Sequence, residues 1–436
     1  MSWILVLLTA LAATLARSAG VDFEAAARQE GEVRAGAIAR SGADRMIAFL
    51  ATAGPAPTGQ PAWRDAADEF ESVEFGAGSY TLYYVDPADG ARRYGAREES
   101  SKLNLNVASQ GMIEAVVDAV LSRARTSYYY DAVEYAAAIV DYRDSDSTPL
   151  EDGAEIEYYA TLMPPYEPKN AAYESLAELL LVRGIDERLL WGEDTNRNGR
   201  LDASEDDGGA RFPEDDADGE LDPGLADFFT VYSYDVNESA AGATRIDLNQ
   251  TSREALQEAL GAYLSSDKID AIDRQRRRGG FQTIGQLVDV QGLGMEDVQA
   301  VIDLVTTSSE EYLYGLVNVS AAPREVLDAL PGFGEGTVDR LLEDRAARTE
   351  GLDTIGWTLE ILNKDEFRSL AAFFTARSYQ FEIAAVGELA HGATYRRVRA
   401  VVDLARLDSE GPRFLHLADE TYLGPVFSSA EREARE

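Results

Sequence analysis

The N-terminal part of the chain joins an apolar segment to a helix-favouring one without a helix breaker between them. Residues 3–16 (WILVLLTALAATLA) are apolar and uncharged, and Arg17 follows directly. From there to Ala53 the chain is rich in Ala, Glu and Arg, and the first proline is Pro55. This composition favours helix. The pattern therefore predicts one helix from the N-terminus to about residue 53.

The apolar segment of about 14 residues is shorter than the roughly 20 that cross a bilayer and has the length of a signal-peptide core. One interpretation is a cleaved secretory signal followed by a surface helix. However, no basic residue precedes the apolar run, and ARSAG (16–20) matches a cleavage site only loosely. An apolar helix that continues into a soluble half is typical of type IV pilins. We expect this second arrangement, with an N-terminal transmembrane helix over residues 1–54.

Strand patterns occur near both ends of the chain. The breaker-rich segment GPAPTGQP (54–61) ends the helix, and residues 79–106 have the alternation of a hairpin with a turn at 86–90. Two further strand-like segments, at 379–389 and 394–407, lie near the C-terminus. These patterns predict a small antiparallel sheet built from both ends of the chain, so that the residues between form an insertion.

The middle of the chain, from about residue 107 to 377, has helical patterns and an internal echo. LNLNVAS (103–109), IDLNQTS (246–252) and LVNVSAA (316–322) are similar, and each precedes a helix-like run. The second and third continue into segments with the helix-hairpin-helix pattern, at 274–304 and 326–345. Glycines such as Gly292, Gly294, Gly332 and Gly334 permit a sharp turn whose N–H groups can bind a DNA phosphate.

Charge argues against such binding here. The net charge is -38, and Asp289, Glu296, Asp297, Glu335 and Asp339 surround the two glycine turns. A basic cluster, Arg274, Arg276, Arg277 and Arg278, is better explained as a solvated or carboxylate-paired helix end. Acidic surfaces repel nucleic acid. We expect packing modules and no nucleic-acid partner, and keep a helix-hairpin-helix DNA-binding or DNA-uptake protein as the alternative function.

The length of 436 residues predicts several domains. The expected fold class is α+β: a pilin-like helix and a small antiparallel sheet, with a large, mainly helical insertion containing helix-hairpin-helix (SAM-like) modules. The predicted regions are 1–54, 61–106, 107–240, 241–377 and 378–436. The absence of cysteine excludes disulfides and thiolate sites, and the two histidines, His391 and His416, lie in no triad or metal-ligand spacing. We therefore expect no enzyme.

Residues 131–184 carry a family resemblance. Their motifs are an acidic turn at 141–146, EIEYY at 155–159, PYEPKN at 165–170 and SLAELLLVRG at 175–184, preceded by LNLN at 103–106. In this order and spacing they resemble the type II secretion minor pseudopilin K family. The resemblance extends from the ARSA segment (16–19) to about Tyr379.

The resemblance implies a pilin-like fold and a structural role at the tip of a periplasmic pseudopilus, together with other minor pseudopilins. It also implies a single-pass inner-membrane protein, with most of the chain in the periplasm, that takes part in protein export across the outer membrane.

An EF-hand pattern occurs at EDTNRNGRLDASEDDG (193–208). Gly199 stands at position 6, where the tight turn needs glycine, and Leu201 at position 8 would anchor the loop. The candidate ligands at positions 1, 3, 5, 7, 9 and 12 are Asp194, Asn196, Asn198, Arg200 (through its carbonyl), Asp202 and Glu205. The pattern predicts a Ca²⁺ site; the alternative is an acidic turn without an ion.

A second acidic loop, EDDADGELDPG (214–224), offers Asp216, Asp218 and Asp222 at positions 3, 5 and 9. Position 12 falls on Leu225, so Asp227 or the first loop would have to supply the last ligand. A second Ca²⁺ site and a solvated loop both remain open. A third acidic set, Asp141, Asp144 and Asp146, has no glycine turn and is expected to serve as a cap or in salt bridges.

Overall fold

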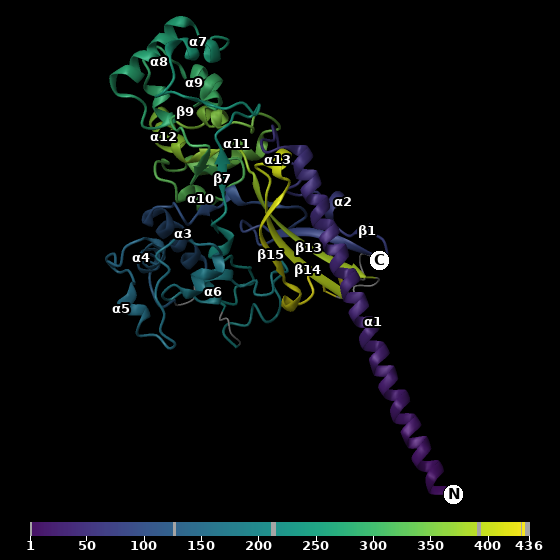
Figure 1. Cartoon of the computed structure of the whole chain (residues 1–436). Helices are drawn as coiled ribbons and strands as arrows, with labels where there is room; N and C mark the ends of the chain where they lie inside the picture. The colour runs from purple at the N-terminus through teal and green to yellow at the C-terminus, as the bar shows by residue number, and fades with distance from the viewer. Residues whose placement is uncertain (1, 125–127, 211–214, 390–393, 429, 432–436) are drawn as a thin grey trace.

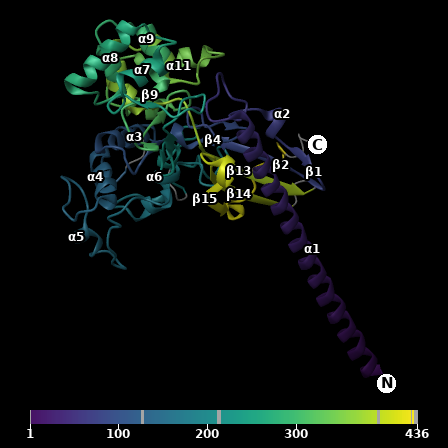
Figure 2. The same cartoon turned by 45° about the horizontal axis from the view of Figure 1, so that its top comes forward.

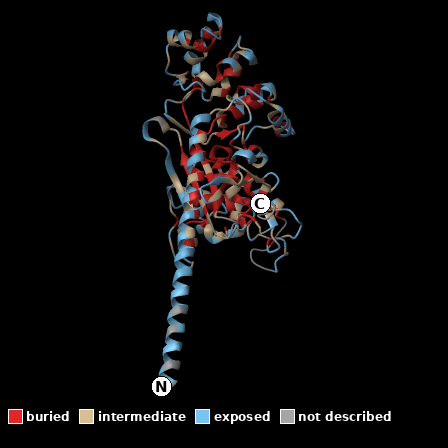
Figure 3. Ribbon diagram, turned by 90° about the vertical axis from the view of Figure 1, so that its right-hand side faces the viewer, coloured by how far each residue is buried: buried red, intermediate tan, exposed pale blue. Residues whose placement is uncertain are grey.

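One long helix dominates the N-terminal part of the computed structural model, which describes residues 2–124, 128–210, 215–389, 394–428 and 430–431. Helix α1 (Ser2–Ala53) runs without a break, as the sequence predicted, and Gly54 closes it with a φ of 77° and a hydrogen bond to the carbonyl of Leu50. Its C-terminal half packs against the body, and its N-terminal half projects away (Figure 1). The projecting half is exposed (Figure 3).

The apolar segment 3–16 forms the first turns of this projecting half. Large side chains are exposed there: Trp3, Ile4 and Leu7 have 85%, 66% and 71% of their surface accessible. The side chains of Leu5, Val6, Ala10, Ala12 and Ala16 lie outside the described residues. A search of the described part of the chain finds no helix with both the length and the apolarity needed to span a membrane.

The sheet is antiparallel and joins both ends of the chain. Its strand order is β1-β2-β13-β14-β15, with β3 paired to β2 and β4 paired to β13. The bounds are β1 (Val73–Phe75), β2 (Gly78–Val85), β3 (Arg92–Arg93), β4 (Arg97–Glu98), β13 (Gln380–Leu389), β14 (Thr394–Asp403) and β15 (Arg413–Asp419). The expected hairpin and the two C-terminal strands are confirmed. The edge strand β15, which carries His416, was not expected; His391 lies outside the described residues.

Helix α1 lies across one face of this sheet (Figures 1 and 2). Ile38, Met46 and Leu50 from the helix form a core with Leu82 and Ile383 from the strands. The helix approaches β13 closely because that strand has a glycine at the contact. A Cβ on Gly387 would lie 2.3 Å from the carbonyl oxygen of Ala35, too close for any side chain.

The insertion begins with a helical region that follows the sheet strands. Two short helical elements, α2 (Ala67–Phe70) and η1 (Glu99–Ser101), precede the insertion. Two others, α13 (Leu407–Glu410) and η9 (Thr421–Leu423), lie among the C-terminal strands. The first region contains β5 (Leu103–Asn104), α3 (Gln110–Arg123), α4 (Ala132–Arg143), α5 (Ile156–Tyr159), η2 (Leu176–Leu181), α6 (Glu187–Trp191), η3 (Leu225–Asp227) and β6 (Phe229–Thr230).

Two further regions have the same order of elements: a short strand, several helices and a returning strand. The second contains β7 (Tyr234–Val236), β8 (Ile246–Asp247), α7 (Arg253–Leu260), α8 (Ser266–Gly279), η4 (Ile284–Asp289), α9 (Met295–Val301), η5 (Ile302–Leu304), β9 (Val305–Thr306) and β10 (Tyr312–Tyr314). The third contains β11 (Val317–Asn318), α10 (Arg324–Asp328), α11 (Thr337–Ala347), η6 (Ile355–Glu360), α12 (Lys364–Leu370), η7 (Ala371–Phe373) and β12 (Phe374–Thr375).

The sequence echo corresponds to a repeated structural unit. In each region a two-residue strand pairs in parallel with a strand that returns after the helices: β5 with β6, β8 with β9, and β11 with β12. Asn104, Asp247 and Asn318 occupy the same place in the three units. Each accepts, through its side-chain oxygen, a hydrogen bond from the backbone N–H two residues later. The repeated Asn or Asp therefore fixes the turn that leads into the helices.

The helix-hairpin-helix segments place glycine turns between short helical elements. Gly292 and Gly332 have φ values of 97° and 127°, which disfavour other residues. One apolar core runs through all three regions, from Leu103 to Phe374. The helix-hairpin-helix assignment and the division near residue 240 remain predictions. The expected pairing of the basic cluster is confirmed for Arg276 and Arg277, which form ion pairs with Asp273 at 2.7 and 2.8 Å.

Candidate metal centre

The predicted EF-hand loop begins with a tight turn around Asp194. Its carboxylate accepts hydrogen bonds from the backbone N–H groups of Asn198 and Gly199 at 2.9 and 2.8 Å. Gly199 has a φ of 66°, as position 6 requires. Asp194 is only 8% exposed, and burial raises its pKa. The first half of the loop therefore curls around a buried carboxylate.

The other end of the loop is closed by Glu205, which is 4% exposed. One carboxylate oxygen accepts from the hydroxyl of Thr195 at 2.9 Å, and the other accepts from the N–H of Asp202 at 3.1 Å. Burial raises the pKa of Glu205, and the negative charges of Asp194 and Asp202 add to this effect. Glu205 therefore faces back into the loop that Asp194 opens.

Amide side chains fill the middle of the loop. Asn196 and Asn198 both donate from Nδ2 to one carboxylate oxygen of Asp202, each at 2.9 Å. Their amide oxygens are buried and have no hydrogen-bond partner. Unpaired buried oxygens are costly, and oxygen atoms of this kind are the ligands that Ca²⁺ prefers. The donor set of the loop thus fits a calcium ion.

Arg200, at position 7, was expected to contribute only its carbonyl. Its guanidinium lies 3.5 Å from a carboxylate oxygen of Asp202 and 3.8 Å from one of Glu431. This side chain partly neutralises Asp202. The carboxylates of Asp194, Asp202 and Glu205 do not gather within ligand distance of one another in the described structure. An ion would therefore have to draw the three groups together.

The loop backbone is tied to the outer face of the sheet, a connection that the sequence did not reveal. Arg397 on β14 donates to the carbonyls of Asn196 and Arg197 at 2.7 and 2.9 Å. Arg92 on β3 donates to the carbonyl of Asn198 at 2.9 and 2.6 Å. Both arginines come from strands far from the loop in sequence. The loop consequently links the insertion to the sheet.

The second acidic loop has a different arrangement from the predicted one. Asp216 and Asp218 form local turns, accepting from backbone N–H groups two residues later at 3.0 and 2.9 Å. Asp222 lies beside Glu193 instead, whose carboxylate accepts from the Asp222 N–H at 3.1 Å. Leu225, at position 12, is fully buried in the core. Glu214 lies outside the described residues.

The pairing of Asp222 with Glu193 places two carboxyl groups in a buried setting. Burial raises the pKa of Glu193 to about 7; the hydrogen bond from the Asp222 N–H opposes this shift, and the negative charges of Asp222 and Asp216 add to it. Burial raises the pKa of Asp222 to about 6, with Arg123 opposing the shift. Asp227, the suggested replacement ligand, forms an ion pair with Arg97, with 3.1 Å between its carboxylate and the guanidinium. Metal binding by Asp216, Asp218 and Asp222 stays a prediction.

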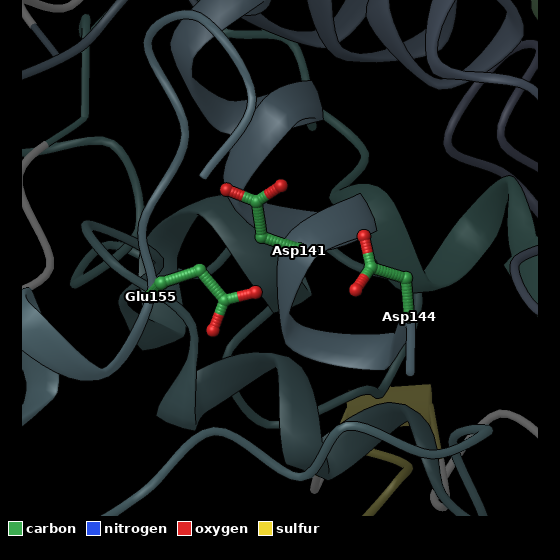
Figure 4. Close-up of side chains that lie close together, drawn as sticks. All are labelled: Asp141, Asp144 and Glu155. Carbon is green, nitrogen blue, oxygen red and sulfur yellow. The ribbon is translucent and has the colours of Figure 1, made fainter. Parts of the chain in front are cut away.

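A third cluster brings three carboxyl groups together more closely than either loop. Single oxygens of Asp141, Asp144 and Glu155 all lie within 4.8 Å of one another, and no other such group occurs among the described residues (Figure 4). Asp141, at the end of α4, is fully buried and accepts from the N–H groups of Leu150 and Ala154 at 3.1 and 2.7 Å. Asp146, the third member expected from sequence, instead forms an exposed turn with Thr148.

Glu155 distinguishes this cluster from a helix cap. It is 2% exposed, and neither carboxylate oxygen has a hydrogen-bond partner. Burial raises its pKa to about 7, and the charges of Asp141 and Asp144 contribute. Gly153 allows the chain to pass close to Asp141, because a Cβ at this position would lie 1.9 Å from a carboxylate oxygen of Asp141. The expectation of a cap or salt-bridge role is incomplete, since the acidic groups converge on one another.

Comparison with known proteins places this cluster in a recognised family region. Residues 101–191 match the family described as type II secretion system (T2SS), protein K, which confirms the resemblance found in the sequence. No curated protein sequence matches the chain. A solved structure, the GspK-GspI-GspJ complex of the type 2 secretion system from enterotoxigenic Escherichia coli, contains a similar chain. That likeness covers 90% of this chain and 97% of that chain, with 10% identity and a TM-score of 0.44.

Proposed function

From the protein K match over residues 101–191, we propose that the chain is a minor pseudopilin of a type II secretion system. Its place is the tip of the periplasmic pseudopilus, and its role is structural rather than enzymatic. The family match carries this proposal. The long helix packed across an antiparallel sheet supports it, because this architecture allows the chain to assemble through α1 while the insertion stays outside the helical bundle.

Other minor pseudopilins are the proposed partners, in keeping with the protein K match over residues 101–191. The N-terminal half of α1 offers the surface for such packing. Val21 and Phe23 are 59% and 75% exposed on it, and Val33, at the start of the following half, is 68% exposed. Apolar side chains of this size on a projecting helix favour contact with other helices.

The apolar segment 3–16 is the proposed anchor in the inner membrane, with the rest of the chain in the periplasm. Leu7 and Leu11 are exposed there, at 71% and 56%. Replacing both with Arg should move the chain from the membrane to the soluble fraction, because a charged residue in a bilayer is costly. Gln29→Arg, beyond the segment, is the matched control. Recovery of the native chain as a free periplasmic protein beginning near Val21 would contradict the anchor.

Calcium is the proposed stabiliser of the insertion. The orphaned amide oxygens of Asn196 and Asn198 support binding in the first loop, and the unpartnered carboxylate of Glu155 supports it in the third cluster. Each set holds buried oxygens that accept no hydrogen bond from the protein. A cation with a flexible oxygen shell would compensate both, whereas Mg²⁺ should substitute poorly in a full cage of protein oxygens.

Deletion of the gene in its native host tests the function. Secreted proteins should accumulate in the periplasm, and the full chain should restore export. A chain lacking α1 should not restore it, although its body keeps the insertion. Cysteines placed at Val21 and Val33 should crosslink to another minor pseudopilin. Normal export by the deletion strain would refute the proposal.

A further inference from the structure

A cavity of about 470 Å³ lies where three parts of the chain meet. Its walls come from the β2–β3 turn and β4, from the end of α3, and from the third repeat unit around α10 and α11. Three carboxylates line it: Asp86, Glu98 and Glu325. Five arginines also line it: Arg64, Arg97, Arg123, Arg324 and Arg345. A cavity with more cations than anions is unexpected in a chain of net charge -38.

Four of these arginines have carboxylate partners. Arg64 lies 2.9 Å from Glu98, and Arg123 lies 3.1 Å from Glu325. The other two pair with residues outside the lining, Arg97 with Asp227 and Arg324 with Asp339. Their charges are therefore balanced within the protein.

Arg345 differs from the other four. Its Nη1 donates to the backbone carbonyls of Val319 and Ala322 at 3.1 and 2.7 Å, and it forms no ion pair with any described residue. Burial, followed by the positive charge of Arg64, lowers its pKa to about 10. A half-buried guanidinium without a counter-charge is unfavourable. The folded chain thus carries, at the cavity wall, a cation that forms no ion pair with a described residue and is attracted by Glu98 and Asp86 only from a greater distance.

Arg64 holds the same backbone segment. Its Nη1 donates to the carbonyl of Ser320 at 2.9 Å, between the two carbonyls that Arg345 uses. Two guanidinium groups therefore lie along residues 319–322 and repel each other. Glu98 neutralises only one of them. An anion bound from the cavity would supply the missing partner.

We propose that this cavity binds a small dianionic oxyanion of the phosphate or sulfate class, with Arg345 as the principal contact and Arg64 beside it. Guanidinium groups present paired N–H donors that match the oxygens of such ions. A negative charge there would balance Arg345, the lining arginine that forms no ion pair with a described residue. Because the walls belong to three separate parts of the chain, the bound ion stabilises their packing.

Thermal unfolding of the full chain tests the proposal. The Tm is measured in low millimolar phosphate, sulfate or acetate, each compared with chloride at the same ionic strength, and calorimetry measures binding of phosphate and sulfate. We expect the Tm to rise with phosphate or sulfate, with binding of one ion per chain. A rise of equal size in acetate would overturn the assignment to a dianion.

Two variants separate the site from general salt effects, since these ions also stabilise proteins non-specifically. Arg345→Gln should lose the Tm rise and the heat of binding. Arg277→Gln, which removes an exposed arginine paired with Asp273, should keep both. If Arg345→Gln does not fold, the wild-type protein is treated with phenylglyoxal, and modified arginines are mapped by mass spectrometry. Phosphate should then protect Arg345 but not Arg277. Equal modification with and without phosphate, or no heat of binding in the wild-type chain, would overturn the proposal.

Discussion

The guanidinium of Arg397 donates a hydrogen bond to the backbone carbonyl of Asn196 at 2.7 Å, and this contact joins the sheet to the predicted calcium loop. Arg397 is 1% exposed and also contacts the hydroxyl of Tyr83 at 2.9 Å. The outward carbonyls of the loop are thus held by the sheet, while its side chains face inward. An ion that fixes the loop would also fix the insertion against the sheet.

Removal of the two carboxylates at the ends of this loop should abolish the response to calcium. We expect Asp194→Ala with Glu205→Ala to lower the Tm in calcium and to give the same Tm in calcium and in chelator. At a calcium concentration 100-fold above Kd, the ion should contribute about 2.7 kcal/mol to the free energy of unfolding of the wild-type chain. Differential scanning calorimetry measures the change.

The matched control is Glu335→Ala with Glu343→Ala, which removes two exposed carboxylates far from the loop in sequence. This pair should keep the calcium response. If the wild-type chain melts at one temperature in calcium and in chelator, and calorimetry detects no calcium binding, the EF-hand interpretation is wrong.

Gly153 should tolerate no side chain. Gly153→Ala would push a methyl group into the carboxylate of Asp141, 1.9 Å away. We expect it to lower the free energy of unfolding by about 1–3 kcal/mol, the usual cost of overpacking. Urea unfolding measures it. Gly111→Ala, in helix α3 with nothing within 4 Å of the new Cβ, should be neutral or stabilising. Equal effects of the two substitutions would contradict the close packing around Asp141.

Lys102 should be essential to the buried junction between η1 and β13. Its ammonium lies 3.2 Å from Glu99 and 2.7 Å from Glu382, and Lys102 and Glu99 are each 2% exposed. Lys102→Met leaves the buried carboxylate of Glu99 without a cation, while Glu382 keeps its ion pair with Arg399, and we expect a loss of about 3–5 kcal/mol in the free energy of unfolding. Adding Glu99→Gln, which removes the carboxylate left without a cation, should recover part of the loss. A single variant as stable as the wild-type chain would refute the role.

The pH dependence of the same lysine has a definite sign. Burial lowers its pKa from 10.5 to about 8, so the unfolded chain binds this proton more tightly than the folded chain between those values. The free energy of unfolding contributed by Lys102 therefore rises as the pH increases through this window. The difference in unfolding free energy between the wild-type chain and Lys102→Met should grow from pH 8 to pH 10. A difference that shrinks would show that the lysine is not destabilised by burial.

The alternative DNA-binding function predicts the opposite of what we expect. Because Asp273 pairs with Arg276 and Arg277, and the chain is strongly acidic, a gel-shift assay of the full chain should show no binding at physiological salt. Tight binding that weakens with salt and is lost in Arg276→Gln with Arg277→Gln would mean that the glycine turns recognise DNA.

Local patterns were sufficient to predict much of the architecture. The uninterrupted helix to Ala53, the turn at Asp86 to Gly90 and the alternation in β13 and β14 are encoded by neighbouring residues. Strand β15 was missed. Its residues are largely exposed at the edge of the sheet, and pairing with β14 fixes them more than their own pattern does.

The same distinction applies to the candidate metal centre. The loop ligands from Asp194 to Glu205 follow a fixed local spacing, so the sequence could indicate them. Glu155 could not be assigned in this way, because the chain must turn at Gly153 before its carboxylate meets Asp141. The anchoring arginines, Arg92 and Arg397, approach the loop only in the folded chain. Long-range packing therefore determines what spacing does not show.

The pairing of β2 with β13 determines which part of the protein can fold first during synthesis. Tyr83 lies opposite Ala384, about 300 residues later in the chain, so the ribosome must make nearly the whole protein before this pair can form. The insertion, which lies between them, ends with β12 and is therefore translated before β13 begins. A chain that stops short of β13 would present α1 without the surface that covers its buried face. Only a fully translated chain can therefore offer a finished subunit for assembly.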